Sequence, residues 1–213
     1  MLKKLLLLSC MVLLTGCQSA YYSAMEQVGV HKREILVDRV ENARDAQGEA
    51  QEQFKDALEQ YRAVVQFDGG KLETLYDRLQ AEYDDSVEAA DNVSERIKGV
   101  EQVAQALFEE WEEELEQYQS ANLRAQSAKQ LKDTKNRYTA LLRIMKRAEQ
   151  RMQPVLSALN DNVLYLKHNL NARAVGALKG EFAGIQQNID RLINEMQRSI
   201  QESDTFIRAM ETQ

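Results

Sequence analysis

Cysteine is almost absent from this chain. Its 213 residues include two cysteines, Cys10 and Cys17, both near the start. The rest of the sequence therefore has no internal disulfide, no thiolate metal site and no cysteine nucleophile. The two histidines, His31 and His168, lie far apart and neither begins an HExxH motif. We therefore expect no metal and no cofactor.

Turn-forming and aromatic residues are also scarce. The sequence holds one proline and nine glycines, and 7% of its residues are aromatic. Few turn residues imply few connections between elements, and the abundance of Ala, Glu, Gln, Leu, Arg and Lys favours helices. So few aromatics argue against a thick globular core, and they suit a thin helical bundle or a coiled coil.

Basic residues are fewer than acidic ones, with 27 Lys and Arg against 34 Asp and Glu. The net charge is −7, and it becomes −9 without the first sixteen residues, which contain Lys3 and Lys4 but no acid. Binding to nucleic acid needs a basic footprint on the protein surface. An acidic chain of this kind predicts no nucleic-acid partner.

No apolar run is long enough to span a membrane. Lys3 and Lys4 precede an apolar run from Leu5 to Leu14, whereas a spanning helix needs about 20 residues. This arrangement is typical of a secretory signal. Its ending, Leu14-Thr15-Gly16-Cys17, resembles the lipobox of bacterial lipoproteins. That resemblance implies cleavage before Cys17, so that residues 1–16 are removed, and lipidation of Cys17.

The location of the protein depends on that interpretation. The alternatives are an ordinary signal peptide followed by a chance cysteine, or a thiol at Cys17 that pairs with a partner. In lipoproteins the residue after the lipidated cysteine influences sorting, and Gln18, which is not Asp, favours the outer membrane over the inner one. We expect a cell-envelope protein that faces the periplasm from the inner leaflet of the outer membrane.

Apolar residues recur with alternating spacings of four and three, which is a heptad pattern. We predict an all-α fold, an elongated up-down bundle of about four long antiparallel helices, as a single domain over residues 17–213. The third helix carries Pro154, where we expect a kink or a short break. The inward positions predicted for the first helix run from Leu36 to Val64, and only Gln47 interrupts their apolar pattern. Those predicted for the second helix continue at the same spacing to Glu114 and Tyr118. The predicted helices span roughly residues 20–67, 71–119, 123–170 and 173–211.

The connection between the second and third helices lacks Gly and Pro. Residues 101–116 contain seven acids and no base, whereas residues 124–151 contain nine bases and two acids. A hairpin at Ser120-Ala121-Asn122 would place the acidic segment beside the basic one, and Ser and Asn suit a helix cap. A continuous helix of about eighty residues is the alternative, and we favour the hairpin.

The sequence offers no catalytic residue, so we expect a protein that is not an enzyme. Trp111 is the only tryptophan and lies among glutamates; it either packs in the core or marks a contact surface, and core packing is favoured. His168, Asn169 and Asn171 form a polar helix end. We consider Trp111 and these three residues as candidate interaction residues, with Cys17 as the lipidation site.

Two segments, residues 21–54 and 152–178, resemble a group of gammaproteobacterial lipoproteins known only as a domain of unknown function. The resemblance implies an all-helical lipoprotein and supplies no activity, ligand or catalytic residue. We expect a non-enzymatic scaffold or interaction module, anchored to the membrane by its lipid, with an unidentified envelope protein as partner and with homo-oligomers allowed. The alternative function is binding of a peptidoglycan fragment, a lipid or a cation near residues 154–171.

Overall fold

The computed structural model describes residues 31–69 and 71–212. It contains four long helices: α3 (Lys32–Val65), α4 (Leu72–Leu115), α5 (Ala121–His168) and α6 (Ala172–Glu211). The described residues contain no β-strand. The predicted all-α fold is confirmed. The predicted signal peptide, Cys17 and the start of the first predicted helix lie outside the described residues.

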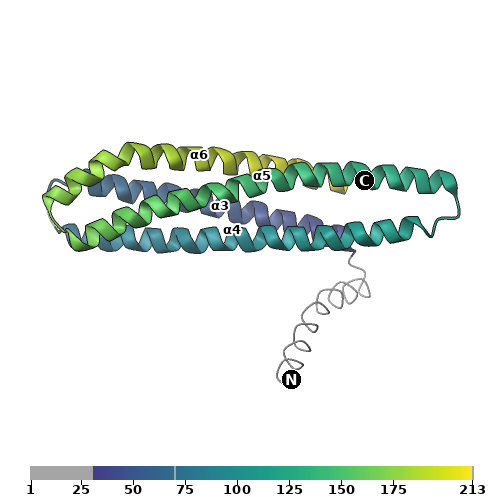
Figure 1. The fold of residues 1–213 in the computed structure, drawn as a ribbon, viewed down its shortest axis with the longest axis horizontal. Coiled ribbons are helices and arrows are strands. Elements are labelled where there is room, and N and C mark those ends of the chain that lie inside the picture. The colour runs from purple at the N-terminus through teal and green to yellow at the C-terminus, as the bar shows by residue number, and fades with distance from the viewer. Residues whose placement is uncertain (1–30, 70, 213) are drawn as a thin grey trace, which may run out of the picture.

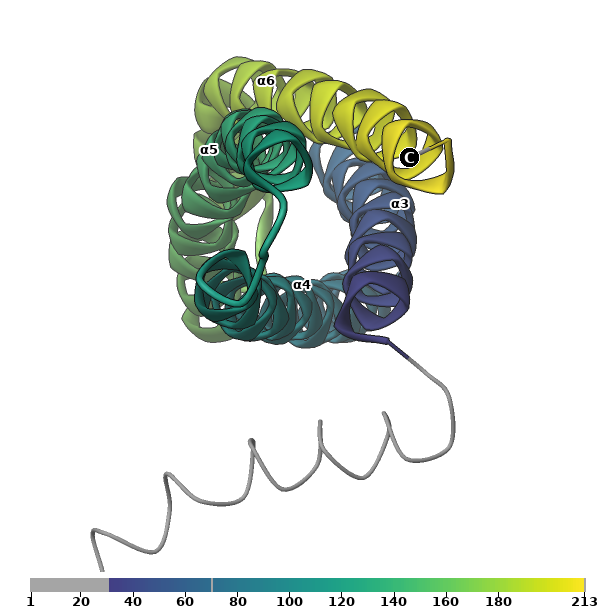
Figure 2. The same ribbon diagram turned by 90° about the vertical axis from the view of Figure 1, so that its right-hand side faces the viewer.

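The four helices form an up-down bundle with short connections. Each helix packs on the two helices that neighbour it: α3 on α4 and α6, and α5 on α4 and α6. Viewed along the long axis, the helices occupy the four corners of a square (Figure 2). Successive helices run antiparallel along this axis (Figure 1), as short loops between neighbouring helices require.

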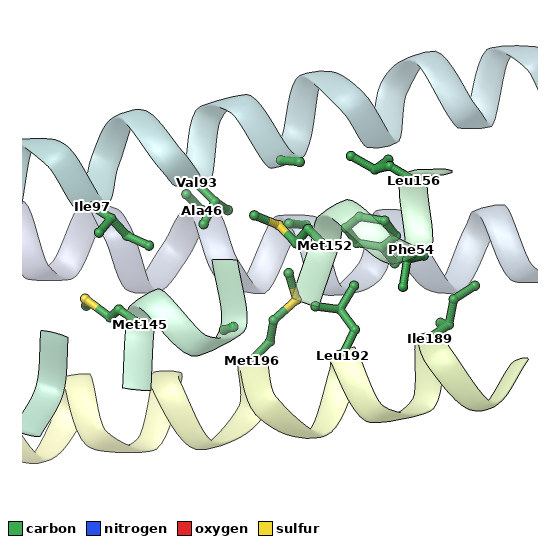
Figure 3. Close-up of a cluster of buried hydrophobic side chains, with 14 of the residues drawn as sticks. Ala46, Phe54, Val93, Ile97, Met145, Met152, Leu156, Ile189, Leu192 and Met196 are labelled. Carbon is green, nitrogen blue, oxygen red and sulfur yellow. The ribbon is translucent and has the colours of Figure 1, made fainter. Parts of the chain in front are cut away.

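The heptad positions form the core. Every predicted inward residue of α3 from Leu36 to Val64 is buried, including Gln47. In the middle of the bundle, Phe54, Val93, Met152 and Leu192 point into the shared interior from the four helices (Figure 3). Complete burial of such a side chain contributes about 1.5–3 kcal/mol. The core is therefore one continuous apolar column along the axis of the bundle.

Among the described residues, only two helices form one end of the bundle. The α4–α5 hairpin extends past the start of α3 and the end of α6 (Figure 1). Lys32, the first residue of α3, already lies beside Glu110, with 2.8 Å between Nζ and Oε1. Residues of α4 and of the following turn beyond Glu110 are no longer covered by α3 and α6, so Glu114 and Tyr118 are exposed. Their prediction as inward positions is wrong, because neither α3 nor α6 reaches them.

The connections use the polar residues expected of them. Ser120 caps α5, its Oγ accepting a hydrogen bond from the backbone N–H of Leu123. The chain reverses over residues 116–120, so the hairpin is correct and the continuous helix is not. The turn lies slightly earlier than predicted, because Ala121 and Asn122 already belong to the first turn of α5.

Pro154 lies inside α5 without ending it. The helix is continuous from Ala121 to His168, so the structure shows no break there. Proline removes one backbone hydrogen bond to the residue four positions earlier, here Gln150. Both Pro154 and Gln150 are exposed, so water can form a hydrogen bond with the free carbonyl of Gln150.

Among the described helices, none is both long and apolar enough to cross a bilayer.

Candidate functional site

The turn between α5 and α6 holds three of the candidate residues. His168 is the last residue of α5 and is exposed. Asn169 follows as the C-cap, and its Nδ2 donates to the carbonyl of Tyr165 at 2.9 Å. Asn171 is the N-cap of α6, and its Oδ1 accepts from the backbone N–H of Arg173 at 3.0 Å and of Ala174 at 3.2 Å.

These hydrogen bonds assign structural roles to the two asparagines. Each one satisfies backbone groups that a helix end leaves unpaired. They do not decide whether the turn also contacts a partner, which stays a prediction for His168, Asn169 and Asn171. Within the described residues no group of three or more His, Cys, Asp and Glu side chains could hold a metal ion.

A groove of about 430 Å³ lies between α5 and α6, next to this turn. It falls in the region, residues 154–171, where the alternative function places a ligand. Its walls carry two carboxylates, Asp161 and Glu181, together with the exposed ring of Tyr165. The remaining lining residues are Ala158, Asn162, Ala177, Leu178 and Ile185. The lining is thus apolar below and acidic at the rim.

A hydrogen-bonded tyrosine lies beneath this groove. The hydroxyl of Tyr61 in α3 is 2.9 Å from Oδ1 of Asn162 and 3.0 Å from the carbonyl of Leu178. Asn162 Nδ2 in turn donates to the carbonyl of Ala158 at 2.7 Å. The Tyr61 ring stacks on Phe182, with 5.8 Å between the ring centroids. The network joins α3, α5 and α6.

The environment keeps Tyr61 neutral. Burial raises the pKa of its hydroxyl, and the nearby charge of Glu181 raises that pKa further. A phenol with a raised pKa stays protonated near neutral pH, so its hydroxyl acts as a hydrogen-bonding group and not as a base. The side chains that the groove offers at its surface are the carboxylates of Asp161 and Glu181, because the hydroxyl of Tyr61 is buried and already bonded within the chain. Its floor holds the helices together.

Trp111 lies at the opposite end, where the α4–α5 hairpin leaves the bundle. Its ring is partly buried and packs against the end of the core. The indole Nε1 donates to Oγ of Ser127 at 2.8 Å, from α4 to α5. This supports core packing as its main role, because the polar edge of the ring is already bonded within the chain. A contact with a partner stays a prediction.

Ion pairs align α4 with α5 as the charge pattern predicted. Lys135 Nζ lies 2.5 Å from Glu112, Arg124 lies 2.5 Å from Glu116, and Lys146 lies 2.9 Å from Glu101. Desolvation lowers the pKa of Lys146, but hydrogen bonding to Glu101 and the charge of Glu149 together outweigh it, so the pKa is raised. Pairs this exposed contribute only about 0.2–1 kcal/mol each. Their main effect is on register.

Sequence reasoning did not anticipate two surface features. One is a groove of about 550 Å³ between α3 and α4 whose charged lining residues are all acids: Glu49, Asp85, Glu88, Asp91 and Glu95. The other is a row of exposed bases along α5, between Lys129 and Arg151. The block of bases was visible in the sequence. Which of them would remain without an acidic partner depends on the placement of α4.

A family model described as "Protein of unknown function (DUF2959)" matches residues 21–210. The match covers most of the chain, which therefore belongs to this family. Comparisons with functionally characterised proteins and with solved structures find no match. The chain is thus an all-helical member of a family without an assigned activity.

Proposed function

We propose that this DUF2959 protein is a lipoprotein of the gammaproteobacterial type, anchored to the cell envelope through Cys17. In this proposal it acts without catalysis, as a helical scaffold or interaction module on the periplasmic side of the outer membrane. The supporting sequence features are the signal-like segment before Cys17 and the resemblance of residues 21–54 and 152–178 to such lipoproteins. Two or more acyl chains on one cysteine would give stable membrane attachment.

One structural observation carries the proposal: the bundle is long, and the anchor would attach at one of its ends. α4 has 44 residues and α5 has 48, so at 1.5 Å per residue each is about 70 Å long. The first residue of α3 lies at the end where the α4–α5 hairpin projects (Figure 1). A lipid on Cys17 would thus hold that end near the membrane, and the α5–α6 turn would lie far from the point of attachment.

The anchor is tested by changing its cysteine. We expect Cys17→Ser to give an unprocessed or soluble protein, while the unchanged chain fractionates with the outer membrane. Fractionation of the mature Cys17→Ser protein with the outer membrane would refute the lipid anchor.

Crosslinking in intact envelopes followed by purification tests the scaffold role. We expect one or a few specific envelope proteins, and recovery of none would count against it.

The groove between α5 and α6 favours a second candidate function, the binding of an envelope ligand. Its acidic rim suits a cationic or hydroxyl-rich molecule, such as a peptidoglycan fragment that carries free amines. The probe is a soluble disaccharide-peptide fragment of peptidoglycan, titrated by calorimetry. Binding that is lost in Asp161→Asn and Glu181→Gln, but retained in Glu88→Gln in the other groove, would support this function. Absence of heat at millimolar fragment would reject it.

A further inference from the structure

Charge is segregated between two neighbouring helices of the bundle. α4 carries fourteen acids and three bases, whereas α5 carries ten bases and three acids. The two helices pack side by side (Figure 2). A chain with a net charge of −7 therefore has one strongly basic helix. Pairing with α4 accounts for only part of this basic charge.

Three bases of α5 face α4 and are paired: Arg124, Lys135 and Lys146. Besides Lys167 near the end of α5, six others are exposed, and no acid pairs with these six within the described part of the chain. They occupy the side of α5 that faces away from the core, since the intervening Leu131, Leu141, Met145 and Ala148 are buried. We call these six the basic stripe: Lys129, Lys132, Arg137, Arg143, Arg147 and Arg151.

The basic stripe is long and nearly uniform in charge. It spans about 33 Å, from Lys129 to Arg151, at 1.5 Å per residue. Two acids lie within this stretch of α5, Asp133 and Glu149. Glu149 forms an ion pair with Lys146, with 3.3 Å between Oε2 and Nζ. Asp133 is therefore the only acid that is exposed among the bases of this stretch. The outer face of α5 is thus a positive strip on an otherwise acidic molecule.

We propose that the basic stripe is a docking surface for an anionic phospholipid membrane, so that the bundle lies along the membrane with α5 against the headgroups. This proposal builds on the proposed anchoring at Cys17, because the lipid would keep the stripe close to its target. Each Lys or Arg held near an anionic headgroup surface strengthens binding about fivefold. Six of them form a surface that needs no defined pocket.

The chemistry of the stripe favours lipid over other anionic partners. The exposed large apolar residues of the described chain are Tyr118, Leu123, Leu164, Tyr165 and Leu170, and all lie outside the stripe. A protein partner usually engages aromatic or other apolar anchor residues, and single-stranded nucleic acid uses aromatic stacking. Headgroup phosphates require only positive charge on a flat, extended surface, and the stripe has that composition.

The position of α3 also suits this partner. Cys17 and Lys32 are fifteen positions apart, a stretch that can span at most about 50 Å. Lys32 is paired with Glu110 near the end of α4, and Glu112 is paired with Lys135 within the stripe region of α5. The start of α3 and the Lys129 end of the stripe therefore lie at the same end of the bundle. A lipid on Cys17 would bring the stripe within reach of the same membrane.

The test measures binding of the mature chain without its lipid, residues 18–213, which retains all four described helices. Vesicles of phosphatidylglycerol and phosphatidylcholine are compared with vesicles of phosphatidylcholine alone, in a sedimentation assay at low and physiological salt. We expect binding to the anionic vesicles only, weakening as salt is raised. The triple variant Lys129→Glu, Arg143→Glu, Arg147→Glu should bind at least about tenfold more weakly.

The matched control reverses three exposed bases on α6: Arg173→Glu, Lys179→Glu and Arg191→Glu. It changes the net charge by the same amount and should keep most of the binding, and circular dichroism should show both variants folded. Equal losses in the two variants, or no binding to anionic vesicles, would overturn the proposal. Tighter binding to a duplex DNA of 30 base pairs than to the vesicles would also overturn it. Since no lipid on Cys17 is involved, failure here is distinguishable from failure of the anchor.

Discussion

The hydroxyl of Tyr61 in α3 lies 2.9 Å from Oδ1 of Asn162 in α5, across the interior of the bundle. These helices occupy opposite corners of the square in Figure 2, and the two residues are 101 positions apart. The same hydroxyl lies 3.0 Å from the carbonyl of Leu178 in α6. One tyrosine therefore fixes the relative level of three helices at the end of the bundle that carries the α5–α6 turn.

Replacing this tyrosine tests that role. Tyr61→Phe keeps the ring and its stacking on Phe182. It removes the hydroxyl that donates to Asn162 Oδ1 and so leaves this buried acceptor without that hydrogen bond. We expect the free energy of unfolding to fall by about 1–3 kcal/mol, measured by urea denaturation. In the double variant Tyr61→Phe, Asn162→Leu, part of the loss should be recovered, because no unpaired polar group remains. An unchanged midpoint in Tyr61→Phe would contradict a structural role for this network.

Gln47 is another polar residue in the core, but its side chain, unlike the hydroxyl of Tyr61, forms no hydrogen bond within the described chain. It is fully buried, and neither its Oε1 nor its Nε2 has a hydrogen-bond partner in the described chain. Ser199 on α6 also has an unpartnered hydroxyl. A buried polar residue at a heptad position lowers stability and can specify register.

We therefore expect Gln47→Leu to raise the free energy of unfolding by about 1–3 kcal/mol. The control is Gln53→Leu on the same helix, where the amide donates to Glu82 at 2.7 Å and is only partly buried. That change should lower stability or leave it unchanged. Destabilisation by Gln47→Leu would show that ordered water or a partner satisfies the amide in solution.

Every heptad position predicted in α3, from Leu36 to Val64, is buried, because α3 packs on both α4 and α6. The pattern did not include five further buried residues of this helix: Ile35, Ala46, Gln51, Leu58 and Val65. It was wrong for Glu114 and Tyr118, although they continue the same spacing. The pattern shows which face of a helix would be covered. It does not show whether another helix extends far enough to cover it, which depends on where α3 and α6 end.

The same limit applies to the candidate sites. The charge blocks correctly placed the acidic segment of α4 beside the basic segment of α5, where Glu112 pairs with Lys135, because attraction between segments can be read from composition. The Tyr61–Asn162 contact could not be predicted, since it depends on the relative levels of two helices that are not adjacent. The caps at Ser120 and Asn171 follow from local chemistry alone. Local and periodic features were thus predictable, whereas contacts across the bundle were not.

The turn between α3 and α4 depends on one glycine conformation. Gly69 has a φ of 150°, a region that residues with a side chain rarely adopt. A Cβ atom there would meet nothing within 4 Å, so only the backbone opposes substitution. We expect Gly69→Ala to lower the free energy of unfolding by about 1 kcal/mol, as measured by denaturation.

Gly180 in α6 is the matched control, because a Cβ there also meets nothing within 4 Å. Gly180→Ala should raise stability by about 0.5–1 kcal/mol, since alanine is the better helix former. The two alanine substitutions thus have opposite expected signs. Stabilisation by both would show that the backbone at Gly69 relaxes without cost.

Stability should also fall in alkaline solution, and Tyr138 gives the pH range. Burial, and to a smaller extent the charge of Glu101, raises the pKa of its hydroxyl to about 12, from 10.0. Between these two values the unfolded chain releases the proton while the folded chain retains it. The folded state then binds more protons, so the free energy of unfolding falls as the pH rises from about 10 to about 12. Below pH 10 this contribution is fully present.

Tyr61 acts in the same direction, because burial raises the pKa of its hydroxyl as well. Thermal melts at pH 9, 10 and 11 of the unchanged chain and of Tyr138→Phe measure the effect. We expect the melting temperature of the variant to fall less steeply over this range. Equal slopes for Tyr138→Phe and the unchanged chain would show that the hydroxyl at position 138 ionises as readily in the folded protein as in the unfolded one.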